Sequence, residues 1–193
     1  MKKIAIAFAI IFSFLSNAQN QESTATKSIY IKGNALLLPI GMLNAGVEYQ
    51  LKEKVTLQAD VFVSPWKSFM GNHAQVYMGT VEARYYFKEA FSKFYVGLNL
   101  GSAVFDIQKW NYFNTDNYQR GFTILGGATV GYQFKIKENW NIDLYLGGGN
   151  SQGFYRGYLK KSGARYDDDG RRWDKSGEWI PYKGGVMISY KLK

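Results

Sequence analysis

The residues of this chain that could do chemistry are few, and most stand in the wrong context. Ser64-Pro65-Trp66-Lys67 fits the S-x-x-K pattern of serine acylation chemistry, and Lys175-Ser176-Gly177 is similar to its K-T-G partner element. That chemistry needs the serine at the start of a helix in a larger helical domain. Because the sequence predicts no such helix, we interpret both matches as chance spacing.

His73 is the single histidine, and it stands near Ser64 and Ser68 in the sequence. A Ser-His pair could carry out acyl chemistry on a barrel wall. Neither serine lies in a G-x-S-x-G context, however, and a lone histidine in a polar loop is usually just solvated. We therefore predict that the protein is not an enzyme and has no catalytic residue.

Metal and cofactor chemistry is also poorly supported. Asp167-Asp168-Asp169-Gly170 is similar to the start of a calcium loop, but Arg171 and Arg172 stand where such a loop needs oxygen ligands. The chain has no cysteine, which excludes thiolate zinc sites and disulfides. The sequence predicts neither a metal nor a cofactor.

The composition favours a single domain rich in strands. Of 193 residues 17% are aromatic, 21 are glycine and only 3 are proline. Beyond the N-terminus no apolar run approaches the roughly 18 residues that a membrane helix needs. The net charge of +9 would suit nucleic acid in a cytosolic protein, but an exported chain meets lipid headgroups and glycans instead, so we predict no nucleic-acid partner.

The N-terminus is typical of a secretory signal peptide. Lys2 and Lys3 precede the apolar run Ile4 to Leu15, and Ser16-Asn17-Ala18 supplies the small residues that signal peptidase recognises. We predict a signal peptide at residues 1–18, a polar segment at 19–27 and one folded domain at 28–193.

The mature chain alternates between apolar and other residues with a period of two. From Val55 to Ser64, for example, Val55, Leu57 and Ala59 interleave with polar residues. Such alternation predicts half-buried strands, and helical spacing does not fit it. The eight predicted strands cover residues 29–37, 43–51, 55–64, 77–87, 94–105, 122–134, 140–148 and 182–192.

Short and long connections alternate between these strands. Three short ones carry a Lys-Glu pair directly after an apolar strand end, at residues 51–54, 87–90 and 136–139. Apart from a tight connection around Pro39-Ile40-Gly41, the others are long: 64–74, 106–120 and 150–179. This alternation predicts an eight-stranded, up-and-down, antiparallel transmembrane β-barrel with short periplasmic turns and long extracellular loops.

Aromatic residues gather at the short-turn rim. The predicted belt consists of Tyr49, Tyr85, Phe87, Tyr132, Phe134 and Tyr190, with Phe94 and Trp140 nearby. Aromatics favour strands in general, but a belt at one height is typical of a membrane interface.

If the apolar set faces lipid, the alternate set must face inward. The predicted lumen charge network consists of Glu48, Asp60, Glu82, Arg84, Asp143 and Lys183. A barrel of about eight strands has room only for its own side chains, so these ions should pair into a plug. Alternation alone leaves open a soluble barrel with the charges outside and an apolar ligand cavity.

The predicted long loops contain aromatic residues beside cations. We take Trp66, Trp110, Tyr112 and Trp173 as candidates for interaction. Such residues suit contact with lipopolysaccharide, a glycan or a surface protein, or they pack the loops onto the rim.

Several segments resemble a known family. They include Lys32-Gly33-Asn34-Ala35, Arg84-Tyr85-Tyr86-Phe87, Gly131-Tyr132-Gln133-Phe134 and the stretch from Gly177 to Tyr182. The chain resembles small exported proteins of Gram-negative bacteria that form a domain of unknown function regarded as outer-membrane β-barrel-like. The resemblance implies a fold and a location but no functional residues. The end, Leu192-Lys193, departs from the terminal Phe that is common in such barrels.

Together these patterns predict a non-enzymatic outer-membrane barrel with a structural or cell-surface interaction role. The family resemblance implies a connection with surface structures such as fimbriae. Its expected partners are outer-membrane lipids and lipopolysaccharide, with a surface protein or glycan as a further partner. The alternatives are a barrel-based lipid-modifying enzyme and a soluble periplasmic binding barrel.

Overall fold

The computed structural model describes residues 27–113, 115–167, 170 and 172–193. The predicted signal peptide and most of the polar segment after it lie outside these ranges. Within them, no helix is long and apolar enough to cross a membrane. The elements are β1 (Ile29–Asn34), the 3₁₀ turn η1 (Leu38–Ile40), β2 (Leu43–Lys52), β3 (Val55–Phe69), β4 (Asn72–Tyr86), β5 (Lys93–Ile107), the 3₁₀ turn η2 (Trp110–Tyr112), β6 (Asn117–Lys137), β7 (Trp140–Leu159) and β8 (Asp174–Lys191).

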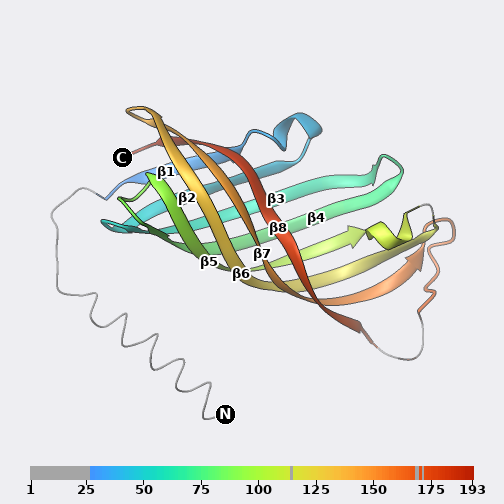
Figure 1. Cartoon of the computed structure of the whole chain (residues 1–193). Coiled ribbons are helices and arrows are strands. Elements are labelled where there is room, and N and C mark those ends of the chain that lie inside the picture. The colour runs from blue at the N-terminus through green and yellow to red at the C-terminus, as the bar shows by residue number, and fades with distance from the viewer. Residues whose placement is uncertain (1–26, 114, 168–169, 171) are drawn as a thin grey trace, which may run out of the picture.

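The eight strands form a closed ring in which each is antiparallel to its neighbours (Figure 1). β1 completes the ring by pairing with β8, where Ile31 lies opposite Tyr190. The number and order of the strands therefore confirm the predicted up-and-down topology.

The strands tilt strongly around the ring. One row of paired residues leaves β8 at Trp179 and returns to the same strand at Tyr190, near its other end. The row runs through Trp179, Asn150, Gly126, Leu100, Val81, Ala59, Val47, Ile31 and Tyr190. Such a stagger fixes both the tilt and the width of a barrel, and with eight strands the interior has room only for side chains.

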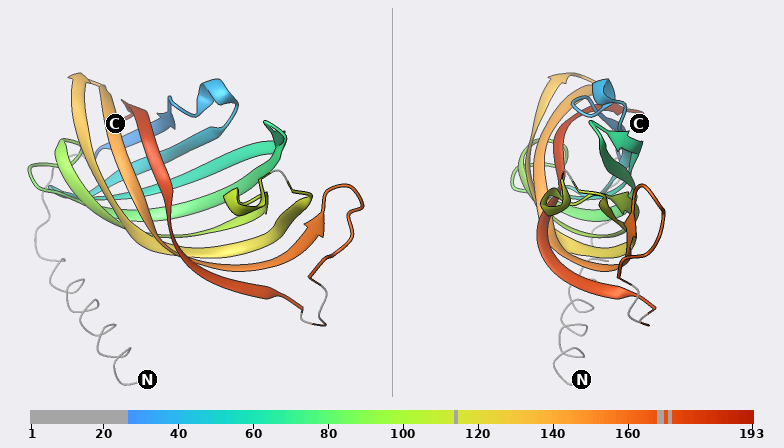
Figure 2. Two further views of the ribbon diagram at one scale, coloured as in Figure 1. Left: turned by 45° about the vertical axis from the view of Figure 1, so that its right-hand side comes forward. Right: turned by 90° about the vertical axis from the view of Figure 1, so that its right-hand side faces the viewer.

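The wall is uneven in height. β1 has 6 residues, whereas β6 has 21 and β7 has 20, so at one end the wall reaches much further at β6 and β7 than at β1 (Figure 2). Many residues that were predicted to lie in the long loops belong to strands, so the predicted lengths of these loops were wrong. β3 and β4 meet in a tight turn at Met70 and Gly71, and the remaining longer loops are 108–116 and 160–173.

The error has a physical reason. The prediction ended each strand where the apolar alternation ended, but main-chain hydrogen bonds continue a ladder whatever side chains it carries. At the opposite end the predicted short turns are confirmed. β2 passes to β3 through Glu53 and Lys54, and β6 passes to β7 through Glu138 and Asn139.

A β-bulge interrupts β8 where it pairs with β7. Gly147 lies opposite Lys183, but the next residue, Gly148, lies opposite Pro181, so Tyr182 is the extra residue. A bulge changes which face the flanking side chains occupy. As a result, both Tyr182 and Lys183 reach polar groups inside the barrel.

Candidate functional site

The two faces of the wall differ sharply in chemistry. On β4, Thr80, Glu82 and Arg84 are buried inside, whereas Val81 and Tyr85 between them are about half exposed on the outside. The same division holds around the ring, so the interior is polar and the outer wall apolar. Alternation alone leaves open which face of the wall carries the charged side chains. In the structure they face inward, and the apolar side chains face outward.

Arg84 is the centre of an ion network in the interior. Its Nε lies 2.6 Å from Glu82 Oε1, and its Nη1 lies 3.2 Å from Glu48 Oε2 and 2.9 Å from Asp143 Oδ2. All four side chains are fully buried. Three carboxylates from three different strands thus converge on one guanidinium.

Lys32 on β1 closes this cluster from the opposite side. Its Nζ lies 2.7 Å from Glu48 Oε2 and 2.6 Å from Asp143 Oδ2, which are the same two oxygens that face Arg84. Lys32 and Arg84 therefore bridge the carboxylates of Glu48 and Asp143, so that no two charges of like sign meet unscreened.

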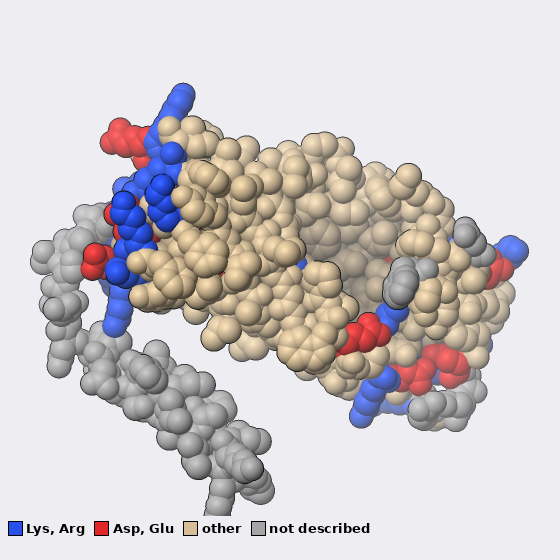
Figure 3. All heavy atoms as spheres, viewed as in Figure 1, with Lys and Arg blue, Asp and Glu red and all other residues tan. Residues whose placement is uncertain are grey.

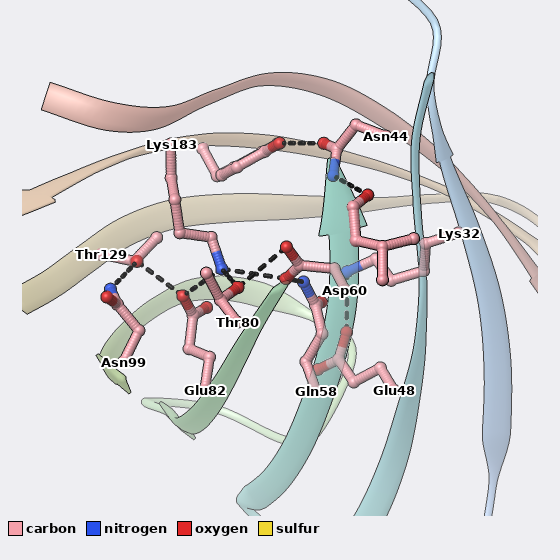
Figure 4. Close-up of polar contacts among 12 residues, drawn as sticks. Lys32, Asn44, Glu48, Gln58, Asp60, Thr80, Glu82, Asn99, Thr129 and Lys183 are labelled. Atoms are coloured by element: carbon pink, nitrogen blue, oxygen red, sulfur yellow. Dashed lines mark hydrogen bonds and ion pairs between the residues drawn. The ribbon is translucent and has the colours of Figure 1, made fainter. Parts of the chain in front are cut away.

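Lys183 extends the network along the barrel. Its Nζ lies 2.9 Å from Asp60 Oδ1 and 3.0 Å from Glu82 Oε2, and it donates a hydrogen bond to Thr80 (Figure 4). Because Glu82 also binds Arg84, the ions form one continuous chain of alternating sign from Asp60 to Lys32.

Neutral side chains satisfy the remaining carboxylate oxygens. The hydroxyls of Thr56 and Tyr86 donate to Glu48, that of Tyr95 donates to Asp143, and that of Thr129 donates to Glu82. Buried ion pairs repay their desolvation only when such extra hydrogen bonds are present. The network is therefore built to hold the strands together across a narrow lumen.

All six side chains predicted for the lumen network lie in it, but the prediction missed Lys32. A usable signal was present in the sequence, because Tyr30, Lys32 and Asn34 alternate with Ile31 and Gly33. All three are buried inside the barrel. The strand itself was predicted, but its inward-facing side chains were not included in the predicted network.

The predicted aromatic belt lies on the outer wall at the short-turn end. Phe87 contacts Tyr85 and Phe94, with ring centroids 5.6 and 5.5 Å apart. Further along the wall Tyr132 packs against Phe134 at 4.5 Å, and Trp140 packs against Tyr190 at 4.9 Å. These rings come from β4 to β8 and the turn after β4, whereas β1 to β3 contribute Tyr49.

Charged residues at the turns lie beyond this belt and form what we call the lysine collar. It consists of Lys52, Lys54, Lys88, Lys93, Lys135, Lys137, Lys191 and Lys193, interspersed with Glu53, Glu89 and Glu138. In Figure 3 the charged side chains gather at the two ends of the molecule, and on the face shown the zone between the ends is almost free of them.

The four predicted interaction residues come from different parts of the chain. Trp66 lies on β3, not in a loop, and its Nε1 donates to the carbonyl of Ile40. The main chain of Trp110 and Tyr112 belongs to η2, and the side chain of Trp110 lies outside the described atoms. Trp173 packs on the outer wall against Phe122 and Arg156.

His73 and Ser64 do not form a pair. His73 Nδ1 lies 2.7 Å from Asp106 Oδ1 on the outer wall, and its ring stacks on Tyr118. The hydroxyl of Ser64 is buried and donates to the carbonyl of Ala74. The Ser-His hypothesis is therefore wrong for this serine.

One serine motif escaped the sequence analysis. Gly149-Asn150-Ser151-Gln152-Gly153 fits the G-x-S-x-G pattern, which in hydrolases forms a sharp turn between a strand and a helix. Here it lies within β7, where Ser151 is buried and its hydroxyl bonds to that of Thr123 at 2.8 Å. The required turn is absent from this stretch, so the match carries no catalytic geometry.

The acidic stretch near residue 167 is used for local structure. Asp167 accepts a hydrogen bond from the amide of Gly157 through one oxygen and pairs with Arg165 through the other. Asp168, Asp169 and Arg171 lie outside the described residues. Among those that are described, no group of three acidic, histidine or cysteine side chains could hold a metal ion.

The fold and its interior define a class: an eight-stranded antiparallel barrel filled by its own ion network and bearing an apolar outer wall. The chain belongs to the family described as "Protein of unknown function (DUF3575)", which matches residues 5–192. This confirms the expected membership in a family of unknown function. No curated protein matches the chain.

Proposed function

We propose that the protein is a non-enzymatic outer-membrane β-barrel with a structural or cell-surface interaction role. The observation that carries the proposal is the inverted polarity of the wall, with buried ions inside and exposed Leu98, Leu100 and Leu146 outside. In water such a wall would leave large apolar side chains exposed to solvent, which is unfavourable, whereas in lipid it is the favoured arrangement.

The two ends of the wall support the same proposal. The aromatic belt lies between the apolar zone and the lysine collar, which is the order in which a bilayer presents hydrocarbon, interface and charged headgroups. A soluble binding barrel needs the opposite arrangement, with charges outside and an apolar cavity within. In this interior Arg84, Glu48 and Asp143 fill the lumen instead.

The filled lumen favours a structural role over transport. Each buried ion has at least one partner of opposite sign on another strand, so the ions hold the strands together. We propose that the long ends of β6, β7 and β8 face the cell exterior, where they would contact surface structures, fimbriae among them.

Fractionation tests this proposal. The expressed full chain should sediment with outer membranes, and it should migrate faster on a gel before boiling than after it, as a folded barrel does. Recovery from the periplasm as a freely soluble protein would contradict the proposal and favour the soluble barrel.

A second candidate is a barrel-based lipid-modifying enzyme, which the His73–Asp106 pair on the outer wall favours. Lipids extracted from cells that express the wild type or His73→Ala should then differ in acylation by mass spectrometry. Identical lipid profiles would leave the structural role as the better account.

A further inference from the structure

Two arginines face each other on the outer wall near the long-strand end. Arg120 on β6 lies directly opposite Arg156 on β7. Lys175 on β8 lies opposite Phe154, two residues from Arg156. Like charges at opposed strand positions repel and are normally avoided. Three cations from three adjacent strands therefore form a cluster that we call the β6–β8 cationic patch.

The patch has more positive than negative charge. Arg120 is held by Asp106, whose Oδ2 lies 2.7 Å from Nη2, but the same carboxylate also binds His73. Within the described part of the chain, neither Arg156 nor Lys175 has a carboxylate at ion-pair distance. The Arg156 guanidinium instead lies 4.6 Å from the Trp173 ring, and its Nε donates to the carbonyl of Arg172.

Aromatic rings form a floor beside these cations. Phe122 stacks on Phe154 with centroids 5.0 Å apart and meets Trp173 edge-on at 5.6 Å. Lys175 Nζ lies 5.8 Å from the Phe154 ring. Further down β6 the wall continues with Ile124, which is exposed. The positive groups thus stand at the edge of the apolar wall and are oriented by rings.

We propose that the β6–β8 cationic patch binds the phosphate-bearing headgroup of a lipid, with the acyl chains lying on Phe122 and Ile124. An arginine fork matches a phosphate group with two parallel hydrogen bonds, and a phosphate between Arg120 and Arg156 would relieve their repulsion. The adjoining apolar floor commits the site to a lipid and not to free phosphate. The inference rests on the proposed membrane residence, and it adds a defined lipid class and location.

Calorimetric titration of the full chain in neutral detergent tests the site. The probes are diphosphorylated lipid A, the same lipid with its phosphates removed, and inorganic phosphate. We expect the phosphorylated lipid to bind about ten-fold more tightly than the dephosphorylated one, since charge-assisted hydrogen bonds are strong. The double variant Arg156→Gln/Lys175→Gln should lose this preference. The control Lys88→Gln/Lys137→Gln, with the same charge change in the lysine collar, should keep it.

Two results would overturn the inference: an unchanged preference in the double variant, or binding of inorganic phosphate as tight as that of the phosphorylated lipid. The boiling-dependent gel shift of each variant reports its folding. If the double variant fails to fold, the single variant Lys175→Gln should still weaken binding several-fold, because this side chain is exposed and its loss breaks no ion pair with any described residue. A chain that fractionates with membranes but fails the titration disproves only the lipid site, whereas a freely soluble chain disproves the proposed function as well.

Discussion

The two faces of β4 carry side chains of opposite polarity. Its inner face presents Glu82 and Arg84, which are fully buried, while its outer face presents Val81 and Tyr85, which are about half exposed. The inner groups find their ion-pair partners within the protein, although one nitrogen of Arg84, Nη2, is buried without a hydrogen-bond partner. The outer groups find few partners there, so their energy depends on the surrounding solvent.

This difference separates what holds the barrel closed from what determines where it resides. A buried ion network costs desolvation and repays it through mutual attraction and hydrogen bonds, whatever lies outside the wall. An apolar outer wall gains or loses free energy with the medium. Substitutions on the two faces should therefore respond differently to a change from detergent to lipid.

The largest effect is expected at the centre of the interior. Arg84→Ala would leave the buried carboxylates of Glu48, Glu82 and Asp143 with too little positive charge. Breaking a buried pair from one side costs about 3–5 kcal/mol. We expect a loss of unfolding free energy of that order, measured by urea denaturation of the folded barrel, in detergent and in lipid alike.

Arg172→Ala is the matched control for that experiment, because Arg172 is exposed and the substitution retains the carbonyl that binds Arg156. It should change the unfolding free energy by less than about 0.5 kcal/mol. Wild-type stability of Arg84→Ala would show that the ion network does not hold the strands together.

The second effect concerns the outer face and depends on the medium. Leu98 lies in the middle of β5 on the outer wall, and 74% of its surface is exposed. Leu98→Arg should cost about 2–4 kcal/mol when the chain folds into lipid vesicles, as a charge near the midplane of a bilayer does. Leu38→Arg, in η1 at the rim, has a similar exposure of 65% and should cost far less.

The comparison between media is decisive for this pair of variants. If both substitutions are equally harmless in vesicles, Leu98 does not face hydrocarbon and the membrane proposal loses its main support. If both are harmful in detergent as well, the residues have a packing role that the exposed positions do not suggest.

The third effect tests how tightly the interior is packed. A Cβ at Gly131 would lie only 2.5 Å from the ring of Tyr95, which contacts the Arg84 guanidinium and whose hydroxyl donates a hydrogen bond to Asp143. Gly131→Ala should therefore cost about 1–3 kcal/mol, as overpacking of a filled core does. Gly33 faces outward with nothing within 4 Å of its Cβ position, so Gly33→Ala should leave thermal stability nearly unchanged. Equal melting temperatures for the two variants would mean that the side chains of the interior can move to accommodate the added methyl group.

The alternation of short and long connections was sufficient to predict the strand order, and the period-two pattern predicted most of the charged side chains that share the interior. Glu82 and Arg84 are two residues apart, and a strand puts such residues on one face. Glu48, Asp60 and Asp143 follow by the same rule on their own strands. The rule predicts which side chains share a face, but not which of them pair across the barrel. The bridging of Glu48 and Asp143 by Lys32 and Arg84 could therefore not be predicted.

Two features lay beyond that rule. The bulge at Tyr182 shifts the pairing of β8 by one residue, and nothing in local alternation marks where a bulge falls. The full lengths of β6 and β7 were also missed, because their outer ends carry cations such as Arg120 and Arg156 where an apolar residue was expected. These are the residues of the β6–β8 cationic patch, so the departure from alternation coincides with the proposed lipid site.

The smallest effect is expected in the lysine collar, where Lys135 Nζ lies 2.9 Å from Glu89 Oε1 and both side chains are about half exposed. The hydrogen bond and charge of Lys135 lower the pKa of the Glu89 carboxyl below its ordinary value. A lowered pKa in the folded state adds stability above the ordinary pKa, and that stability disappears as the pH falls through the lowered value.

Because solvent screens the pair, Lys135→Ala should cost at most about 0.5 kcal/mol at neutral pH, and less in high salt or acid. Chemical denaturation at neutral and acid pH measures this difference, and a cost above about 1 kcal/mol that persists in acid would mean that the collar is coupled to the interior network.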